Sequence, residues 1–321
     1  MTRLLLIILG LQRLMVQGGT RMAFSAIREL LAMANKKQQT IASCMLDVEQ
    51  NETGRTKEEI ITLMTQQFDV MIEAAHQGVE QPMMSRTGLS GGDGYRVEEY
   101  RKKGRSFLGT NTLQSMAYAL SVNEVNAAMG RIVATPTAGS AGILPGVLIA
   151  IYDQQMYAKE VIIQGLFTAA AIGLVIANAA SISGAAGGCQ AEIGSATAMA
   201  AGAAVEIAGG SPEQVGHAVG LALKNSLGLV CDPVGGLVEI PCIIRNGLHA
   251  VTALAAADMA LAGVRSVIPP DEVIHAMYAI GNEMPESLRE TGLGGLAATP
   301  TGKRLREKLF GKMDQQVVEK A

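Results

Sequence analysis

The sequence predicts an all-α protein, organised as one compact helical catalytic domain. Apolar residues recur at helical spacing through most of the chain, and capping residues precede several of these stretches. Alternation of apolar and polar residues, which would indicate strands, is scarce. Glycine is abundant, at 37 residues, and alanine-rich segments are common. Because small side chains let helices approach closely, this composition favours many tightly packed helices.

Composition excludes several classes of function. The net charge is −3 and aromatic residues make up 3% of the chain, so neither a basic surface nor a stacking platform for nucleic acid is expected. The most apolar run, Val161–Ala180, has nearly the length of a membrane span, but a fully buried core helix fits it as well and is preferred. Four widely spaced cysteines do not form a disulfide scaffold, and a reducing cytoplasm suits them better.

The first half of the chain reads as a series of helices. Thr56 and Glu59 form a capping box that opens a helix, and we expect that helix to end at Gly78. His76, near its end, is interpreted as a surface histidine. Cys44 lies within a helical segment and is interpreted as a packing residue. The helices expected in this half cover residues 24–34, 41–50, 57–77, 111–129 and 161–180.

The second half has equally clear helix signals. Ser211, Pro212 and Gln214 supply an N-cap, a first-position proline and the closing residue of a capping box. Gly263 is expected to end a later helix. The helices expected here cover residues 191–208, 212–226, 246–261 and 271–280.

Residues 1–21 differ from the rest of the chain. Their charged start and the apolar run Leu4–Gly10 imitate a signal peptide, but the run is short and Arg13 interrupts the region. We expect a leader or a disordered extension here, with Met22 as the natural start and residues 22–321 as the catalytic domain. A weak signal anchor is the alternative.

Three cysteines, Cys189, Cys231 and Cys242, lie in one glycine-rich and proline-rich stretch. Thiolates are soft ligands that suit zinc or iron–sulfur iron. Their wide spacing lacks the close pairs of a structural zinc site, and three thiolates could hold three corners of a cubane cluster. The simpler interpretation is that they fill the core, as buried cysteines often do. From spacing alone, both interpretations stay open.

Two turns are suited to binding a carboxylate. The stretch 84–94 combines hydroxyl side chains with glycines. The turn at 130–145 is also rich in glycine and hydroxyl groups and precedes an apolar run. If Pro145 lies in the first turn of a helix, the N–H groups of residues 140–143 should face outward as an anion site. Neither a phosphate loop with its lysine nor a dinucleotide fingerprint is present.

Several long motifs, in one order, resemble the alpha subunit of the iron–sulfur-dependent L-serine dehydratases (L-serine ammonia-lyases). The resemblance covers most of residues 22–303. The motifs are SRTGLSGGDG (85–94), GRIVATPTAGSAGILPGVL (130–148), NAASISGAAGGCQAEIGSATAMAAGA (178–203), LGLVCDPVGGLVEIPCIIRN (227–246) and GLGGLAATPTGK (292–303).

This resemblance implies a function. It implies a [4Fe–4S] cluster held by Cys189, Cys231 and Cys242, with an open iron that acts as a Lewis acid on the hydroxyl of L-serine. The products would be pyruvate and ammonia. It also implies a separate beta subunit as partner, because such enzymes are often split into two chains. A cysteine desulfidase of the same superfamily and a non-catalytic metal-binding or interaction subunit are the alternatives.

We expect the substrate carboxylate to be held by the two turns, because its position must direct the hydroxyl toward the iron. The residues expected to bind it are Ser85, Thr87, Gly88, Thr137, Gly139 and Ser140. Lys224 and Asn225, which precede Cys231, are candidate catalytic residues, although Lys224 could equally be a surface lysine. The base that removes the α-proton is unassigned and could come from the beta subunit. A pyridoxal phosphate enzyme is less favoured, because no clear lysine and phosphate-site pair is present.

Overall fold

The computed structural model describes residues 5–6 and 24–311. The predicted leader, 1–21, lies outside the described residues apart from Leu5–Leu6. Those two residues form a short strand, β1, that pairs in parallel with β2 (Val133–Ala134). All other regular structure in the described part of the chain is helical, which confirms the all-α class.

The helices follow one another along the chain, with longer connections before α5, α7 and α12. They are α2 (Ile27–Lys37), α3 (Ile41–Thr53), α4 (Lys57–Glu80), α5 (Asp93–Lys102), α6 (Thr110–Ala127), α7 (Ile143–Asp153), α8 (Lys159–Ala179), α9 (Gly184–Gly187), α10 (Ser195–Ile207), α11 (Pro212–Lys224), α12 (Cys242–Leu261), α13 (Pro270–Glu283) and α14 (Pro300–Phe310). Short helical turns are η1 (Gln190–Gly194), η2 (Val234–Gly236), η3 (Glu286–Leu288) and η4 (Gly295–Ala298). The capping boxes predicted at Thr56 and Ser211 are both present.

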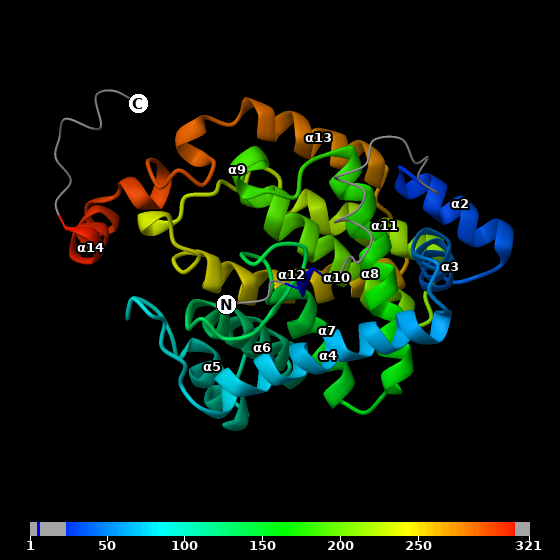
Figure 1. The fold of residues 1–321 in the computed structure, drawn as a ribbon, viewed down its shortest axis with the longest axis horizontal. Helices are drawn as coiled ribbons and strands as arrows, with labels where there is room; N and C mark the ends of the chain where they lie inside the picture. Colours follow the sequence, from blue (N-terminus) through cyan, green and yellow to red (C-terminus); the bar gives the residue numbers. More distant parts are fainter. Residues whose placement is uncertain (1–4, 7–23, 312–321) are drawn as a thin grey trace.

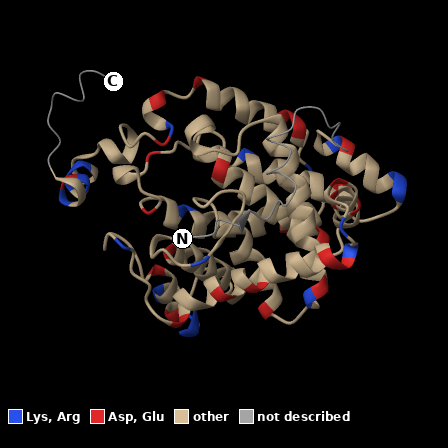
Figure 2. Cartoon of the chain, viewed as in Figure 1, with Lys and Arg blue, Asp and Glu red and all other residues tan. Residues whose placement is uncertain are grey.

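Helix α10 lies at the centre of the bundle and packs against α7, α8, α11 and α12 (Figure 1). Helices α4 and α13 run along opposite edges in this view, and α14 stands at one end. Charged residues are concentrated on the outer helices and loops, whereas the central helices carry few (Figure 2). The small residues predicted to allow close packing do so here. A Cβ at Gly173 of α8 would lie 3.0 Å from the sulfur of Met199 on α10.

Among the described residues, one helix, α8, is long and apolar enough to cross a membrane. In the fold, 78% of its most apolar 18-residue window is buried against other helices. This agrees with the preferred interpretation of residues 161–180 as a core helix. Cys44 is likewise fully buried in the core, as predicted for a packing residue.

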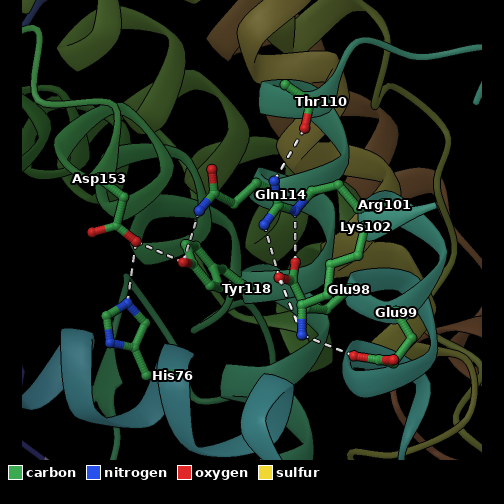
Figure 3. Close-up of polar contacts among 9 residues, drawn as sticks. All are labelled: His76, Glu98, Glu99, Arg101, Lys102, Thr110, Gln114, Tyr118 and Asp153. Carbon is green, nitrogen blue, oxygen red and sulfur yellow. Dashed lines mark hydrogen bonds and ion pairs between the residues drawn. The ribbon is translucent and has the colours of Figure 1, made fainter. Parts of the chain in front are cut away.

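One prediction about α4 is wrong. The helix passes through Gly78 and ends at Glu80. Gly78 is buried, its N–H donates to the hydroxyl of Ser121 at 2.9 Å, and a Cβ would collide with that side chain. The glycine therefore serves close packing against α6 instead of ending the helix. His76, predicted to be a surface histidine, has a side chain that is 37% exposed, and its Nε2 lies 3.2 Å from Oδ2 of Asp153 (Figure 3).

Two boundaries near the cysteines also differ from prediction. Helix α12 begins at Cys242, four residues earlier than expected, so the cysteine lies in the first turn of a helix. The expected helix from residue 191 begins instead with the π-helical turn η1, directly after Cys189, and continues as α10. Such π-helical turns are rare and occur frequently at functional sites.

Candidate functional site

The three cysteines of the glycine-rich stretch come from three different segments. Cys189 precedes η1, Cys231 lies in the connection between α11 and α12, and Cys242 opens α12. All three are buried, with exposed fractions of 1%, 2% and 6%. Although Cys189 and Cys242 are more than fifty positions apart in sequence, the tertiary structure directs all three into one region.

Cys189, Cys231 and Glu192 form the centre of this region. One ligand atom from each lies within 4.8 Å of the others. The Cys242 thiol is close enough to be affected electrostatically: burial raises its pKa, and the charges of Cys189 and Glu192 raise it further. We call these four residues the cysteine site. Two thiols and a carboxylate within this distance are a donor set that could hold a metal ion or cluster, with Cys242 nearby as a further sulfur.

Hydrogen bonds from backbone N–H groups hold the cysteine segments together. The N–H of Gln190 donates to the carbonyl of Leu229 at 2.9 Å, and Oε1 of Gln190 accepts from the N–H of Gly228 at 2.9 Å. These bonds fix the segment after Cys189 to the one before Cys231. Cys231 is tied in turn to the 286–290 segment, because its N–H donates to the carbonyl of Leu288 at 2.8 Å. The cysteine segments are thereby fixed by two main-chain hydrogen bonds and one hydrogen bond to the Gln190 side chain.

Arg245 lies one turn after Cys242 on α12 and faces the site. Its Nη1 donates to Sγ of Cys189 at 3.4 Å and to the carbonyl of Val230 at 2.9 Å. Its Nη2 donates to Asp232 at 2.9 Å, and the other oxygen of Asp232 accepts from the N–H of Leu296 at 2.7 Å. The Arg245–Asp232 pair is buried, with side chains 14% and 4% exposed. A positive charge is therefore held beside a thiol in a region of low dielectric.

The pKa values of Cys189 and Cys231 are shifted in opposite directions. The hydrogen bond from Cys231 lowers the pKa of Cys189, and the charge of Arg245 lowers it further, against the effect of burial. The pKa of Cys231 is raised because its thiol donates that hydrogen bond and is buried. Cys189 is thus the preferred thiolate. Since the thiolate is the form that binds metals, Arg245 supports ligation at Cys189.

Glu192 links the cysteine site to the turn at 137–140. The Thr137 hydroxyl donates to Oε1 of Glu192 at 2.7 Å, and burial raises the pKa of Glu192 to about 7. Gly184 keeps the space beside the site open. A Cβ at Gly184 would lie 2.7 Å from Oε2 of Glu192 and 2.9 Å from Sγ of Cys231. Any larger residue there would occupy the volume next to both ligand atoms.

The turn predicted to bind the substrate carboxylate through Thr137, Gly139 and Ser140 borders the cysteine site through Glu192. Thr137 and Ser140 lie 3.0 Å apart between their hydroxyl oxygens, and a Cβ at Gly139 would lie 3.2 Å from Oε1 of Glu192. The prediction of a free anion site at the N–H groups of 140–143 is wrong for three of the four groups. Those of Ala141 and Ile143 donate to carbonyls of the turn, and that of Gly142 donates to Asn246.

The loop predicted to bind through Ser85, Thr87 and Gly88 does hold a carboxylate, but one of this chain. Thr87 donates from Oγ1 to the two oxygens of Glu239 at 2.9 and 3.0 Å, and Ser90 donates to Oε2 at 2.7 Å. Ser85 lies 3.1 Å from Thr87 between hydroxyl oxygens, and the N–H of Gly88 donates to the Ser85 carbonyl. The hydroxyl groups of Thr87 and Ser90 therefore bind the carboxylate of Glu239, which precedes Cys242 by three positions.

Lys224 and Asn225 take part in other contacts. Nζ of Lys224 donates to the hydroxyl of Ser266 at 2.8 Å, in the connection between α12 and α13. Asn225 is exposed and donates to the carbonyl of Leu221 in its own helix. Both residues close α11, and their described contacts do not include the cysteine site. We assign neither a catalytic role.

Sequence reasoning missed four charged residues of this region. Glu192 follows Cys189 by three positions, Asp232 follows Cys231 directly, Glu239 precedes Cys242 by three, and Arg245 follows it by three. Their signal was proximity to the cysteines in sequence. A charged residue within one helical turn of each candidate ligand can orient it or offset its charge.

Comparison with known proteins supports one family. A family model described as "Serine dehydratase alpha chain" matches residues 36–297. The chain is 54% identical to "Probable L-serine dehydratase, alpha chain" of Bacillus subtilis, over 90% of this chain and 96% of that protein. It is 44% identical to "L-serine dehydratase, alpha chain" of Peptoniphilus asaccharolyticus, over 89% of this chain and 98% of that one.

A second kind of relative is longer. The chain is 42% identical to "L-serine dehydratase" of Streptomyces coelicolor, over 84% of this chain but only 59% of that protein. The matched region of the family model contains all three cysteines of the site, both hydroxyl-rich turns and the charged residues around them. The chain therefore belongs to the serine dehydratase alpha chain family.

Proposed function

We propose that this chain is the alpha subunit of an L-serine ammonia-lyase, a lyase that converts L-serine to pyruvate and ammonia. The observation that carries the proposal is the meeting of Cys189 and Cys231 with Glu192 in one buried site, with Cys242 beside them. In a chain of the serine dehydratase alpha family, this is the place where dehydration chemistry is best supported.

The donor set fits the [4Fe–4S] cluster that the family resemblance implies. Cys189, Cys231 and Cys242 would hold it, and three soft thiolates are one short of the four that ligate such a cluster completely. Gly184 leaves space beside the ligand atoms, and Arg245 offsets negative charge at Cys189. When bound, the cluster would supply a Lewis-acidic iron able to polarise the substrate hydroxyl.

The chain's own residues would position the substrate. Loss of the α-proton and the β-hydroxyl from L-serine gives an aminoacrylate, which becomes an imine and hydrolyses to pyruvate and ammonia. The hydroxyl must be directed at the cysteine site while the carboxylate is held away from it. Thr137 and Ser140, next to Glu192, are the groups we assign to this task, together with the 85–90 loop, which lies against Glu239. Helix packing buries the site and so limits access of water.

We propose a beta subunit as partner. Relatives named as alpha chains are matched over 96% or more of their length, whereas the Streptomyces coelicolor relative, named without a chain, extends well beyond the match. A second polypeptide in the first kind would correspond to the additional length in the second. The proposed location is the cytoplasm, where free thiols persist.

The direct test is anaerobic co-expression with a candidate beta chain, followed by assays for pyruvate from L-serine and for sulfide from L-cysteine. The expected result is a coloured, iron-containing protein that releases pyruvate from serine much faster than sulfide from cysteine. Faster release of sulfide would identify a cysteine desulfidase instead. A colourless protein with tightly bound zinc and no turnover would contradict the proposal.

A further inference from the structure

Glu239 connects two parts of the site that are distant in sequence. Its carboxylate is buried, with the residue 6% exposed, and it accepts hydrogen bonds from Thr87 and Ser90, about 150 positions earlier. Its carbonyl accepts the N–H of Ile243 at 3.0 Å, a bond of the first turn of α12. One residue therefore joins the 85–90 loop to the turn that contains Cys242.

Two hydroxyl groups of the loop, those of Thr87 and Ser90, donate to this carboxylate, and the Ser85 hydroxyl contacts Thr87. The single proton of the Thr87 hydroxyl is directed at Glu239, so Thr87 must accept from Ser85 across their 3.1 Å contact. The N–H of Leu89 also donates to Oγ1 of Thr87, at 3.1 Å. Hydrogen bonds in such a chain polarise one another, and those to an ionised acceptor are stronger than neutral ones. The orientation of the Ser85, Thr87 and Ser90 side chains therefore depends on the Glu239 carboxylate.

We propose that Glu239 is a positioning residue of the dehydration site, which sets the orientation of the 85–90 loop relative to Cys242. The inference rests on the proposed function, because it concerns the loop that would bind the carboxylate of L-serine. The contact could instead be a plug, in which Glu239 occupies the place of the substrate carboxylate and is displaced by it. The two roles differ in sign: losing a positioning residue weakens substrate binding, whereas losing a plug strengthens it.

The contacts favour the positioning role. Glu239 reaches the loop from the segment that leads into α12, and its backbone is fixed on both sides, with its N–H donating to the carbonyl of Leu237 at 2.7 Å. A displaceable plug would more naturally be carried by a segment that is free to withdraw. The second anchor of the loop, from the N–H of Arg86 to the carbonyl of Ala127 at 3.1 Å, ties it to α6. Glu239 completes this support on the side facing Cys242.

The test uses the full chain co-expressed with its beta subunit. Glu239→Ala is expected to raise the KM for L-serine by about 10–100-fold, because bonds from two hydroxyls to an ionised acceptor are lost, while kcat falls less. Glu239→Gln keeps one acceptor oxygen and should recover part of the loss. Glu206→Gln is the matched control, because Glu206 accepts from Ile41, Ala42 and Thr168 far along the bundle. Its KM should equal that of the wild type.

Two further measurements complete the test. The double variant, Ser90→Ala with Glu239→Ala, should show a rise in KM that is smaller than the product of the two single rises by a factor of ~3 or more. The effects are not independent, because both substitutions remove the same hydrogen bond. Amide hydrogen exchange across residues 85–92 should accelerate in Glu239→Ala but not in Glu206→Gln. Additive effects, a lower KM or unchanged exchange would overturn the proposal. Exchange needs no turnover, so an inactive wild type with accelerated exchange in Glu239→Ala would refute the proposed function alone.

Discussion

Two polar regions of this protein, one half-buried and one buried, stabilise their acidic groups differently. In the cluster of His76, Tyr118 and Asp153, the carboxylate accepts from the imidazole at 3.2 Å and from the phenol at 2.6 Å (Figure 3). Burial would raise the pKa of Asp153, but these two hydrogen bonds outweigh it and the pKa is lowered. The carboxylate is therefore stable as an anion, with partners supplied by α4 and α6.

In the cysteine site, acidic groups face one another. Burial raises the pKa of Glu192 to about 7 and also raises the pKa values of Cys231 and Cys242. Arg245 is the cation that contacts a thiol among the described residues, and Asp232 already shares it. The first region balances its own charges, as a structural cluster does, whereas the second gathers ligands whose ionisation a bound cation would favour.

The largest expected effect tests the cysteine site directly. Cys231→Ala should lower both iron content and serine turnover by at least ~100-fold, because loss of a supporting residue alone typically costs about 10–100-fold at a metal site. Iron analysis and the pyruvate assay measure this. Cys44→Ala is the matched control, since Cys44 is equally buried but lies in α3. Equal losses of iron in both variants would remove the distinction between a ligand and a packing cysteine.

The next effect concerns Arg245. Arg245→Met leaves Asp232 buried without its cation, and the free energy of unfolding of the protein without bound metal should fall by about 3 kcal/mol. Urea denaturation measures this. The control is Arg131→Met, whose ion pair with Glu73 is more than half exposed, and which should cost under about 1 kcal/mol. Similar losses of unfolding free energy in the two variants would mean that the buried Arg245–Asp232 pair stabilises the protein no more than an exposed ion pair does.

Glu124 extends the comparison away from the cysteines. It accepts the N–H groups of Asp93 and Gly94, and burial raises its pKa to about 7. Because the folded pKa lies above the unfolded one, its contribution to stability is present at low pH and is lost as pH rises from about 4.5 to 7. Over this pH range, the free energy of unfolding of Glu124→Gln should fall by on the order of 2 kcal/mol less than that of the wild type. Urea denaturation at several pH values measures this.

The surface substitution Glu73→Gln is a suitable control for this measurement, because that side chain is 65% exposed. The decline in its stability with pH is the reference for the decline in Glu124→Gln. A Glu124→Gln variant with the wild-type slope would show that the buried carboxylate is balanced by its neighbours, as Asp153 is.

The smallest effect is expected at His76. The hydrogen bond to Asp153 raises its pKa, so its stabilisation is complete below the unfolded value of 6.5 and is lost as pH rises through the folded value. Asp153 sets the acid limit, since its contribution is lost as pH falls through its lowered pKa. His76→Gln should therefore cost under about 1 kcal/mol near pH 5–6 and less at pH 8, by thermal denaturation.

His275→Gln provides the reference for His76, because His275 is an exposed histidine on α13. Its effect on the melting temperature is the value with which the effect of His76→Gln is compared at each pH. If the effect of His76→Gln shows no variation with pH, the contact between His76 and Asp153 in Figure 3 would contribute no pH-dependent stabilisation.

Much of the fold could be predicted from local patterns. The capping boxes at Thr56 and Ser211 mark helix starts correctly, because the cap, the helical N–H groups and the closing side chain lie within four consecutive residues. The prediction that α4 ends at Gly78 was wrong because the role of this glycine is set by a residue distant in sequence. Whether a glycine ends a helix or lets another helix approach depends on Ser121, which lies 43 positions away.

The same distinction between local patterns and distant contacts applies to the candidate site. The sequence by itself determined the all-helical class, the family and the three cysteines as candidate ligands, because these depend on residue types and their order. Only the tertiary structure decided that Glu192 stands beside Cys189 and Cys231, that Glu239 holds the 85–90 loop, and that Lys224 bonds to Ser266. Side-chain partners across such distances depend on how helices pack, and packing depends on the shape of the whole core.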